Sequence, residues 1–292
     1  MRNLVLIFIA LFALSCTGSN TECKRGVITD SRDLPENIPG ETMGQKLESL
    51  LFWNQEEKER RFSKMHIIYP SIAVPVGNSS KLETGDKIEP KWEGNNIGAY
   101  MEENRVGGLI AIHNNKVVLE EYADGFDENT LWTSYSVAKS VSSMLVGIAL
   151  KNGDIGGMDD KLEKYIPEFV GKDYGQVTVE QLLTMTSGID WNEDYVDPNS
   201  DVAQMYQKPC EGDEAHILTY MKDMKLAHSP GEVWNYSTGE TDLVGILVQK
   251  ASGKSLGEYL SENIWKPYGM NSCAYWLADE CSNLNIGGSG LS

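Results

Sequence analysis

The stretch Ser136-Val137-Ala138-Lys139 opens a segment that is predicted to be helical as far as Lys151, with Gly153 ending the helix. A residue three positions further along a helix lies on the same face, one turn on. The amine of Lys139 can therefore approach the hydroxyl of Ser136. A serine hydroxyl is a poor nucleophile unless a neighbouring group accepts its proton. Ser136 is thus the candidate nucleophile and Lys139 the candidate base.

A simpler interpretation is a serine that caps a helix, followed by an exposed lysine, since this spacing is expected roughly once by chance in such a chain. The mostly apolar surface of the helix argues against it, because an unpaired ammonium is costly where the helix is buried. Burial favours the neutral amine, which can accept a proton. Backbone N–H groups at a helix start suit a developing oxyanion, and the N–H of Ser136 is the candidate donor. The apolar positions are Val137, Val141, Met144, Leu145 and Ile148.

A second feature, Tyr236-Ser237-Thr238-Gly239, lies far downstream and follows the turn-forming pair Pro230-Gly231. A tyrosine phenol close to a lysine amine can act as a base and then as an acid. Tyr236 is therefore a third candidate for proton transfer. The alternative is a loop tyrosine that only caps a turn.

The segment before Ser136 predicts a β-hairpin over residues 106–123, in which Asn114-Asn115 makes the tight turn. Further upstream, residues 45–65 are predicted to be helical and residues 66–100 irregular. Nearly all regular structure after Tyr122 is predicted to be helical, over residues 179–184, 241–251 and 256–264. A two-stranded hairpin rarely forms the sheet of a domain this size. We therefore expect the strands that complete the sheet to lie beyond Ser292.

The N-terminal residues predict export. Arg2 precedes an apolar run over residues 4–14 that is too short to span a bilayer comfortably, which is typical of a secretory signal. The tetrapeptide Ala13-Leu14-Ser15-Cys16 is typical of a bacterial lipoprotein signal, so we expect residues 1–16 to be a signal peptide with lipid on Cys16. A plain signal peptide cut near Ser19 is the alternative. Residues 17–44 are predicted to be a tether, and the protein to lie in the periplasm or cell envelope.

Composition restricts the possible partners. There are 25 Lys and Arg against 43 Asp and Glu, a formal net charge of −18, which argues against nucleic acid and against electrostatic docking on anionic lipid. The four histidines show no metal-ligand spacing, so neither a metal nor a cofactor is predicted. With lipid on Cys16, four cysteines remain for disulfides in an oxidising compartment. Cys273 and Cys281 are close enough in sequence to pair, but connectivity stays open.

Taken together, these motifs resemble a known family. The pattern Ser136-x-x-Lys139, a helical region and then Pro230-Gly231-x-x-x-x-Tyr236-Ser237 is similar to class C β-lactamases, penicillin-binding DD-peptidases and related serine esterases. The resemblance covers roughly residues 45–292 and looks most like the 6-aminohexanoate-oligomer hydrolase branch. Other segments that resemble the family are Leu182 to Gly188, Trp191-Asn192-Glu193, Asp197 to Asp201, Tyr236 to Glu240 and Lys266 to Met270.

The resemblance implies an α+β fold of the β-lactamase and DD-peptidase kind, with an antiparallel sheet, flanking helices and a mostly helical subdomain at about residues 150–230. It implies that Ser136 attacks an amide or ester carbonyl and forms an acyl-enzyme, with Lys139 and Tyr236 sharing the proton transfers. It further implies that Tyr135, Trp191 and Asp197 contact a small substrate, which could be an ester, a linear amide, a β-lactam or a D-amino peptide. Tryptophans 132, 191 and 234 could line the cleft or belong to the core.

Two departures from the family pattern limit this interpretation. Thr238 stands where the second motif often has asparagine, and the Lys-Thr-Gly or His-x-Gly strand is absent from the 292 residues. That strand normally lines the site and supplies an oxyanion-hole donor, whose loss costs about 10²–10³ in rate in other enzymes. The alternative function is a non-catalytic cell-envelope module that binds ligands or senses penicillin with the same fold.

Overall fold

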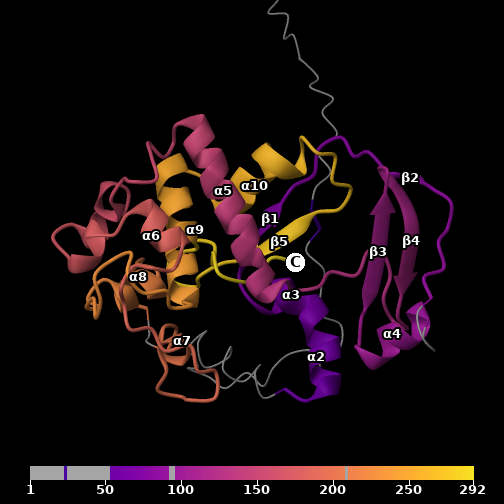
Figure 1. The fold of residues 1–292 in the computed structure, drawn as a ribbon, viewed down its shortest axis with the longest axis horizontal. Coiled ribbons are helices and arrows are strands. Elements are labelled where there is room, and N and C mark those ends of the chain that lie inside the picture. The colour runs from indigo at the N-terminus through magenta and orange to yellow at the C-terminus, as the bar shows by residue number, and fades with distance from the viewer. Residues whose placement is uncertain (1–22, 25–52, 92–95, 208–209) are drawn as a thin grey trace, which may run out of the picture.

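The computed structural model describes residues 23–24, 53–91, 96–207 and 210–292, and the expected signal peptide, its lipidation site at Cys16 and most of the tether lie outside them. The fold is α+β. Its centre is a pair of packed helices, α5 (Ala138–Asn152) and α9 (Thr238–Ser252). The first twelve residues of α9, Thr238 to Gln249, are buried, so this helix forms much of the core (Figure 1). Both helices end at a glycine with positive φ, Gly153 and Gly253, as expected for a left-handed C-cap.

The hairpin expected from the sequence is confirmed. Strands β3 (Gly108–His113) and β4 (Lys116–Tyr122) pair antiparallel. Asn114 and Asn115 have φ of 49° and 61°, the backbone that a type I′ turn needs. The short strand β2 (Glu83–Thr84) pairs parallel to β4, so this three-stranded sheet is mixed and not purely antiparallel.

A second sheet contradicts two expectations. Strand β1 (Ser71–Val74) lies in the region expected to be irregular, and β5 (Ala274–Leu277) lies where only helices were expected. They pair antiparallel with Ser71 opposite Leu277. Each strand has only four residues, and β5 is buried throughout, so neither shows the alternation that identifies a strand in sequence. The helix α4 (Ile97–Glu103) also begins within residues 66–100, and the side chain of Asn96 caps it by accepting from Ala99 N.

Short helices fill the rest of the fold. At the N-terminal side, α2 (Gln55–Arg61) and η2 (Phe62–Lys64) lie within the predicted helix, whose first residues lie outside the described ones. The next helix, α3 (Met65–Ile68), extends three residues past the predicted end at residue 65. Within residues 150–230 the described regular elements after α5 are all helical, as expected. They are η4 (Leu162–Lys164), η5 (Pro167–Phe169), η6 (Asp173–Gln176), α6 (Val179–Leu183), α7 (Asp201–Gln204) and α8 (His216–Met221).

Local sequence signals explain where several of these helices begin. Thr178 caps α6, and Gln181 completes a capping box with it. Ser255 and Glu258 form the same arrangement at α10 (Leu256–Leu260), which continues as the π-helix η7 (Ser261–Trp265). In the described part of the chain no helix is both long enough and apolar enough to cross a bilayer.

Two disulfides cross-link distant segments. Cys23 pairs with Cys273 and Cys210 with Cys281, with Cα–Cα distances of 5.8 and 5.4 Å. The pairing of Cys273 with Cys281 that their spacing allowed is therefore not formed. These bonds join segments 250 and 71 residues apart, which packing and not spacing brings together.

Candidate active site

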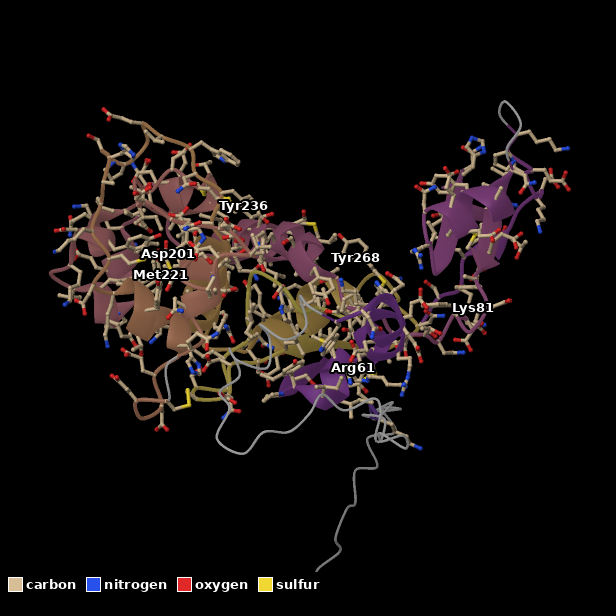
Figure 2. The ribbon with its side chains drawn as sticks, turned by 90° about the horizontal axis from the view of Figure 1, so that it is seen from below. Arg61, Lys81, Asp201, Met221, Tyr236 and Tyr268 are labelled. Atoms are coloured by element: carbon tan, nitrogen blue, oxygen red, sulfur yellow. A yellow bond between two sulfur atoms is a disulfide. The ribbon has the colours of Figure 1, made fainter. Side chains whose placement is uncertain are left out.

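The three candidate catalytic side chains meet at the start of α5. Lys139 Nζ lies 3.3 Å from Ser136 Oγ, and Tyr236 Oη lies 3.2 Å from the same oxygen. The amine of Lys139 also lies 5.4 Å from the centre of the Tyr236 ring. Tyr236 lies at the surface of the helical part of the molecule, away from Lys81 near the hairpin (Figure 2). The expected proximity of the three groups is confirmed. Ser136 is exposed, so a ligand can reach its hydroxyl.

The segment that presents Ser136 is a single 3-10 turn, η3 (Tyr135–Val137), immediately before α5. Tyr135 has a φ of 45°, the left-handed region that costs a non-glycine residue about 1–3 kcal/mol. Its ring packs edge-on against the ring of Phe62, with 5.0 Å between the two ring centroids. Burial raises the pKa of the Tyr135 hydroxyl above the usual range. The ring therefore anchors the strained turn from the core side. This placement does not support the predicted substrate contact of Tyr135.

The helix that carries Lys139 is less enclosed than its apolar sequence implied. Val137, just before the helix, and Met144 are 68% and 51% exposed, so the expectation that this mostly apolar helix is buried holds for only part of its surface. Lys139 itself is partly buried, because it lies on the side of α5 that turns toward α9. The buried residues of α5 are Ala138, Ser142, Leu145, Val146 and Ala149.

The loop that carries Tyr236 is held by backbone hydrogen bonds to the segment after α6. Gly231 N donates to Thr186 O at 2.7 Å, and Asn235 N donates to Met185 O at 3.0 Å. Gly231 and Met185 both have positive φ, 93° and 55°, so the two chains turn sharply where they meet. These contacts give the family-like segment Leu182 to Gly188 a structural role: it fixes the approach of Tyr236 to Ser136.

Two further oxygens surround the amine of Lys139. Thr238 Oγ1 lies 3.1 Å and Gly288 O lies 2.8 Å from Nζ. Gly288 is held in turn by Asp242, whose Oδ1 accepts from Gly288 N at 2.6 Å. Burial raises the pKa of Asp242 to about 6, although a hydrogen bond from Tyr206 opposes the shift. No sequence pattern marks Gly288 or Asp242 as part of this site, because Gly288 is 149 residues from Lys139 and no local motif links them.

The other two predicted substrate contacts, Trp191 and Asp197, have contacts within the protein. The ring of Trp191 is only 4% exposed and packs against Gly239, where an added Cβ would lie 2.6 Å from the ring. Trp191 is thus part of the core, and the predicted contact is not supported. Asp197 uses Oδ1 to accept from Asn199 N at 2.9 Å, so it closes a turn in its own loop. Trp234, for which a core position was slightly favoured, is 65% exposed with its ring 6.5 Å from that of Tyr236.

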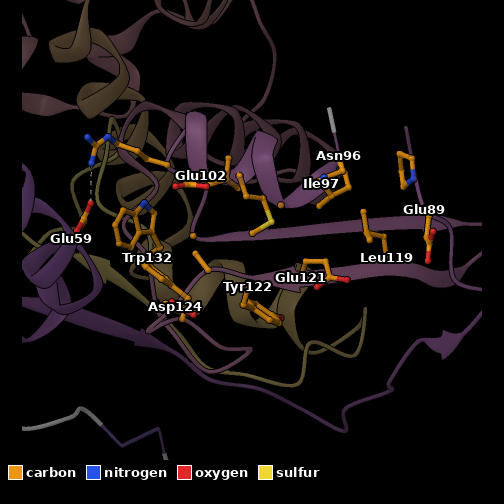
Figure 3. Close-up of a pocket in the computed structure, with 18 of the residues that line it drawn as sticks. Glu59, Glu89, Asn96, Ile97, Glu102, Leu119, Glu121, Tyr122, Asp124 and Trp132 are labelled. Atoms are coloured by element: carbon orange, nitrogen blue, oxygen red, sulfur yellow. Dashed lines mark hydrogen bonds and ion pairs between the residues drawn. The ribbon is translucent and has the colours of Figure 1, made fainter. Parts of the chain in front are cut away.

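A cavity of about 980 Å³ lies elsewhere, between the hairpin, α2 and α4 (Figure 3). Its lining includes Phe62, Met101, Leu119 and Trp132, and none of the candidate catalytic residues. The cavity and the candidate catalytic residues therefore lie in different places in the molecule. Ser136 is the centre of the candidate active site, because a hydroxyl, an amine and a phenol converge there, whereas no such set lines the cavity.

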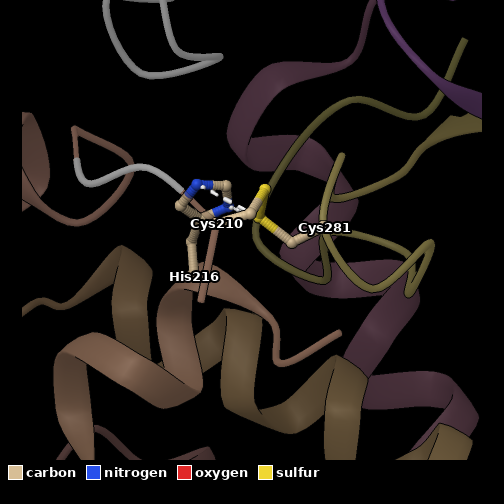
Figure 4. Close-up of side chains that lie close together, drawn as sticks. All are labelled: Cys210, His216 and Cys281. Atoms are coloured by element: carbon tan, nitrogen blue, oxygen red, sulfur yellow. Dashed lines mark hydrogen bonds between the residues drawn. A yellow bond between two sulfur atoms is a disulfide. The ribbon is translucent and has the colours of Figure 1, made fainter. Parts of the chain in front are cut away.

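One cluster of side chains consists of residue types that can bind a metal ion. Cys210, His216 and Cys281 lie together, but their two sulfur atoms are joined in the disulfide (Figure 4). His216 Nδ1 lies 2.7 Å from Asp279 Oδ2, and both residues are buried. With the disulfide formed, neither sulfur is a thiolate that could bind a metal ion. No local sequence pattern predicts this juxtaposition, because His216 and Cys281 are 65 residues apart.

Comparison with known proteins shows which family this chain resembles. The family model described as Beta-lactamase matches residues 94–282. A 6-aminohexanoate-dimer hydrolase of Paenarthrobacter ureafaciens is 26% identical over 242 residues, which are 79% of this chain and 60% of the relative. A penicillin-binding protein of Bacillus subtilis is 25% identical over 188 residues, 58% of this chain and 38% of the relative. The chain thus spans less than two thirds of the length of these relatives.

Among solved structures, one titled "Putative 6-aminohexanoate-dimer hydrolase from Bacillus anthracis" superimposes with a TM-score of 0.69 at 22% identity. It covers 82% of this chain and 66% of that chain, and it supports the fold. The family match extends over more than half of the sequence and includes Ser136, Lys139 and Tyr236. The chain therefore belongs to the beta-lactamase family.

Proposed function

We propose that this protein is a serine hydrolase that cleaves an amide or ester bond through an acyl-enzyme on Ser136. The observation that carries the proposal is the convergence of Lys139 Nζ and Tyr236 Oη on Ser136 Oγ, at 3.3 and 3.2 Å. These are the distances at which a proton can pass between nucleophile and base. The names of the hydrolase relatives support the same reaction class.

In the proposed reaction, Ser136 Oγ attacks the carbonyl carbon while its proton passes to the Lys139 and Tyr236 pair. The same pair returns a proton to the leaving amine or alcohol as the bond to carbon breaks. Water then attacks the acyl-enzyme, and Ser136 recovers its proton as the acid leaves. The N–H of Ser136, at the N-terminal end of α5, is the proposed donor to the oxyanion.

The substrate that these contacts favour is a small amide or ester. Ser136 is exposed, the Tyr236 hydroxyl lies 3.2 Å from its oxygen, and the exposed ring of Trp234 lies 6.5 Å from the Tyr236 ring. Among the relatives, one is named 6-aminohexanoate-dimer hydrolase. Linear amides are therefore the first substrates to test, with p-nitrophenyl esters and a chromogenic cephalosporin beside them.

A fluorophosphonate probe tests the proposed function directly. We expect covalent labelling of the full protein that disappears in Ser136→Ala and persists in Ser140→Ala, an exposed serine one turn along the same helix. A folded sample that is not labelled would instead support the alternative, a non-catalytic module with this fold.

We also propose that the protein is exported and anchored to a membrane through lipid on Cys16. The two disulfides support export, because such bonds persist in oxidising compartments. Cys16→Ala should move the protein from the membrane fraction to the soluble fraction. An unchanged distribution would leave the plain signal peptide as the better interpretation.

A further inference from the structure

The amine of Lys139 has three oxygen neighbours, and two of them can only accept a hydrogen bond. Gly288 O, at 2.8 Å, is a carbonyl and has no hydrogen to donate. Thr238 Oγ1, at 3.1 Å, is a hydroxyl that donates its single hydrogen to Glu193 Oε1. An ionised carboxylate accepts only, so the direction of this bond is fixed. Thr238 must therefore accept from Lys139.

The hydrogens on the amine can now be counted. A neutral amine has two hydrogens and one lone pair, and Gly288 and Thr238 take both hydrogens. The third direction faces Ser136 Oγ at 3.3 Å, and the lone pair is what remains for it. The same three neighbours accept all three hydrogens of the ammonium once the proton has been transferred.

We propose that Glu193 is a positioning residue for this site: by fixing the hydroxyl of Thr238 as an acceptor, it aims the lone pair of Lys139 at Ser136. Glu193 acts through Thr238 and need not touch the substrate. The inference rests on the proposed function, since it assigns to Lys139 the acceptance of the Ser136 proton.

The surroundings of Glu193 keep its carboxylate in this orientation. Its Oε2 accepts from Thr238 N at 3.0 Å and from the indole N–H of the buried Trp191. Its Oε1 accepts from Tyr195 Oη at 2.6 Å as well as from Thr238 Oγ1. The backbone N–H of Thr238 and the indole N–H of Trp191 can only donate. In a variant of Glu193, the atom that takes the place of Oε2 must therefore accept both hydrogen bonds.

This asymmetry makes Glu193→Gln a sharp perturbation. The amide oxygen of glutamine must face the two N–H donors, and its NH₂ then faces Thr238 Oγ1. The NH₂ donates to that oxygen and turns the threonine hydrogen away from Glu193, toward Lys139. The variant keeps the shape of the side chain and reverses the hydrogen bond on which the proposal depends.

The experiment measures the rate of Ser136 labelling by a fluorophosphonate, with kcat and KM for a p-nitrophenyl ester, on the full protein. We expect Glu193→Gln and Thr238→Val each to lower the labelling rate and kcat at least about tenfold, a part of the roughly 10²–10⁴-fold that positioned proton transfer contributes. KM should change little, because neither group is proposed to bind the substrate. Thr238→Ser keeps the hydroxyl and should recover most of the rate lost in Thr238→Val.

The double variant tests whether Glu193 acts through Thr238. If it does, Glu193→Gln combined with Thr238→Val should be no slower than Thr238→Val alone, within about twofold. The matched control is Asp194→Asn, which neutralises the adjacent exposed carboxylate that accepts from Val196 N, and it should leave the rates unchanged. Unchanged thermal unfolding midpoints show that the slow variants are folded.

Each other outcome overturns a definite claim. Wild-type protein without Ser136 labelling refutes the proposed function, and the role of Glu193 falls with it. Labelled wild-type protein with Glu193→Gln and Thr238→Val at normal rates refutes the positioning role alone. Single effects that multiply in the double variant would mean that Glu193 acts independently of Thr238, which also refutes it.

Discussion

Glu240, in the first turn of α9, should make the stability of this protein fall as pH rises. Its side chain is 1% exposed, and Tyr174 Oη donates to its Oε1 at 2.8 Å. Burial raises the pKa of Glu240 from 4.5 to about 7, although hydrogen bonds from Ser187 and Tyr174 oppose the shift. The cause is that the buried site disfavours the charged carboxylate.

The sign and size follow from linkage between protonation and folding. Since the folded state holds this proton up to about pH 7 and the unfolded state only to 4.5, stability from Glu240 is fully present below pH 4.5. It is lost progressively as pH rises from 4.5 through 7. A difference of about 2.5 pKa units corresponds to on the order of 3 kcal/mol in the free energy of unfolding.

Glu240→Gln tests this, because glutamine keeps an acceptor for Tyr174 and cannot ionise. Urea denaturation of both proteins at several values between pH 4 and 8 gives the difference in their unfolding free energies. We expect the wild type to lose about 3 kcal/mol relative to the variant across that range. The titration of Asp242 occurs in both proteins and cancels. Glu232→Gln, at an exposed loop position, is the control and should show no such trend. A difference that stays constant with pH would refute the assignment.

Two further predictions concern packing and covalent links. Gly245→Ala should lower the free energy of unfolding by about 1–3 kcal/mol, because its Cβ would lie 2.7 Å from Gly287 Cα. Gly147→Ala, with no atom within 4 Å of its Cβ, should raise it by about 0.5–1 kcal/mol, and equal denaturation midpoints for the two variants would contradict the packing argument. Cys281→Ser should lower the free energy of unfolding by about 4 kcal/mol, because the disulfide with Cys210 closes a loop of 71 residues. An unchanged denaturation midpoint together with unaltered mobility on a non-reducing gel would show that the bond is not formed.

Local features of this protein could be predicted from its sequence. The separation of Ser136 and Lys139 by three residues places their side chains within reach on any helix. The turn at Asn114-Asn115 and the cap at Thr178 likewise depend only on residues a few positions away. Tyr236 was found through its motif, and its distance from Ser136 became known only from the structure.

Contacts between distant segments required the tertiary structure. Three features join residues between 71 and 250 positions apart: the pairing of β1 with β5, the two disulfides, and the approach of Gly288 to Lys139. The strands β1 and β5 are also too short to show a pattern in the sequence. Glu193 was visible as part of a family-like segment, but nothing in that segment links its carboxylate to the hydroxyl of Thr238.

The sequence by itself determined that the side chains of Ser136 and Lys139 lie within reach of each other, because helical geometry is set by hydrogen bonds between near neighbours. Only the tertiary structure decided what surrounds that amine, because the packing of α5 against α9 and the path of residues 287–288 depend on the whole core. The direction in which Lys139 can share a proton is therefore a property of the fold.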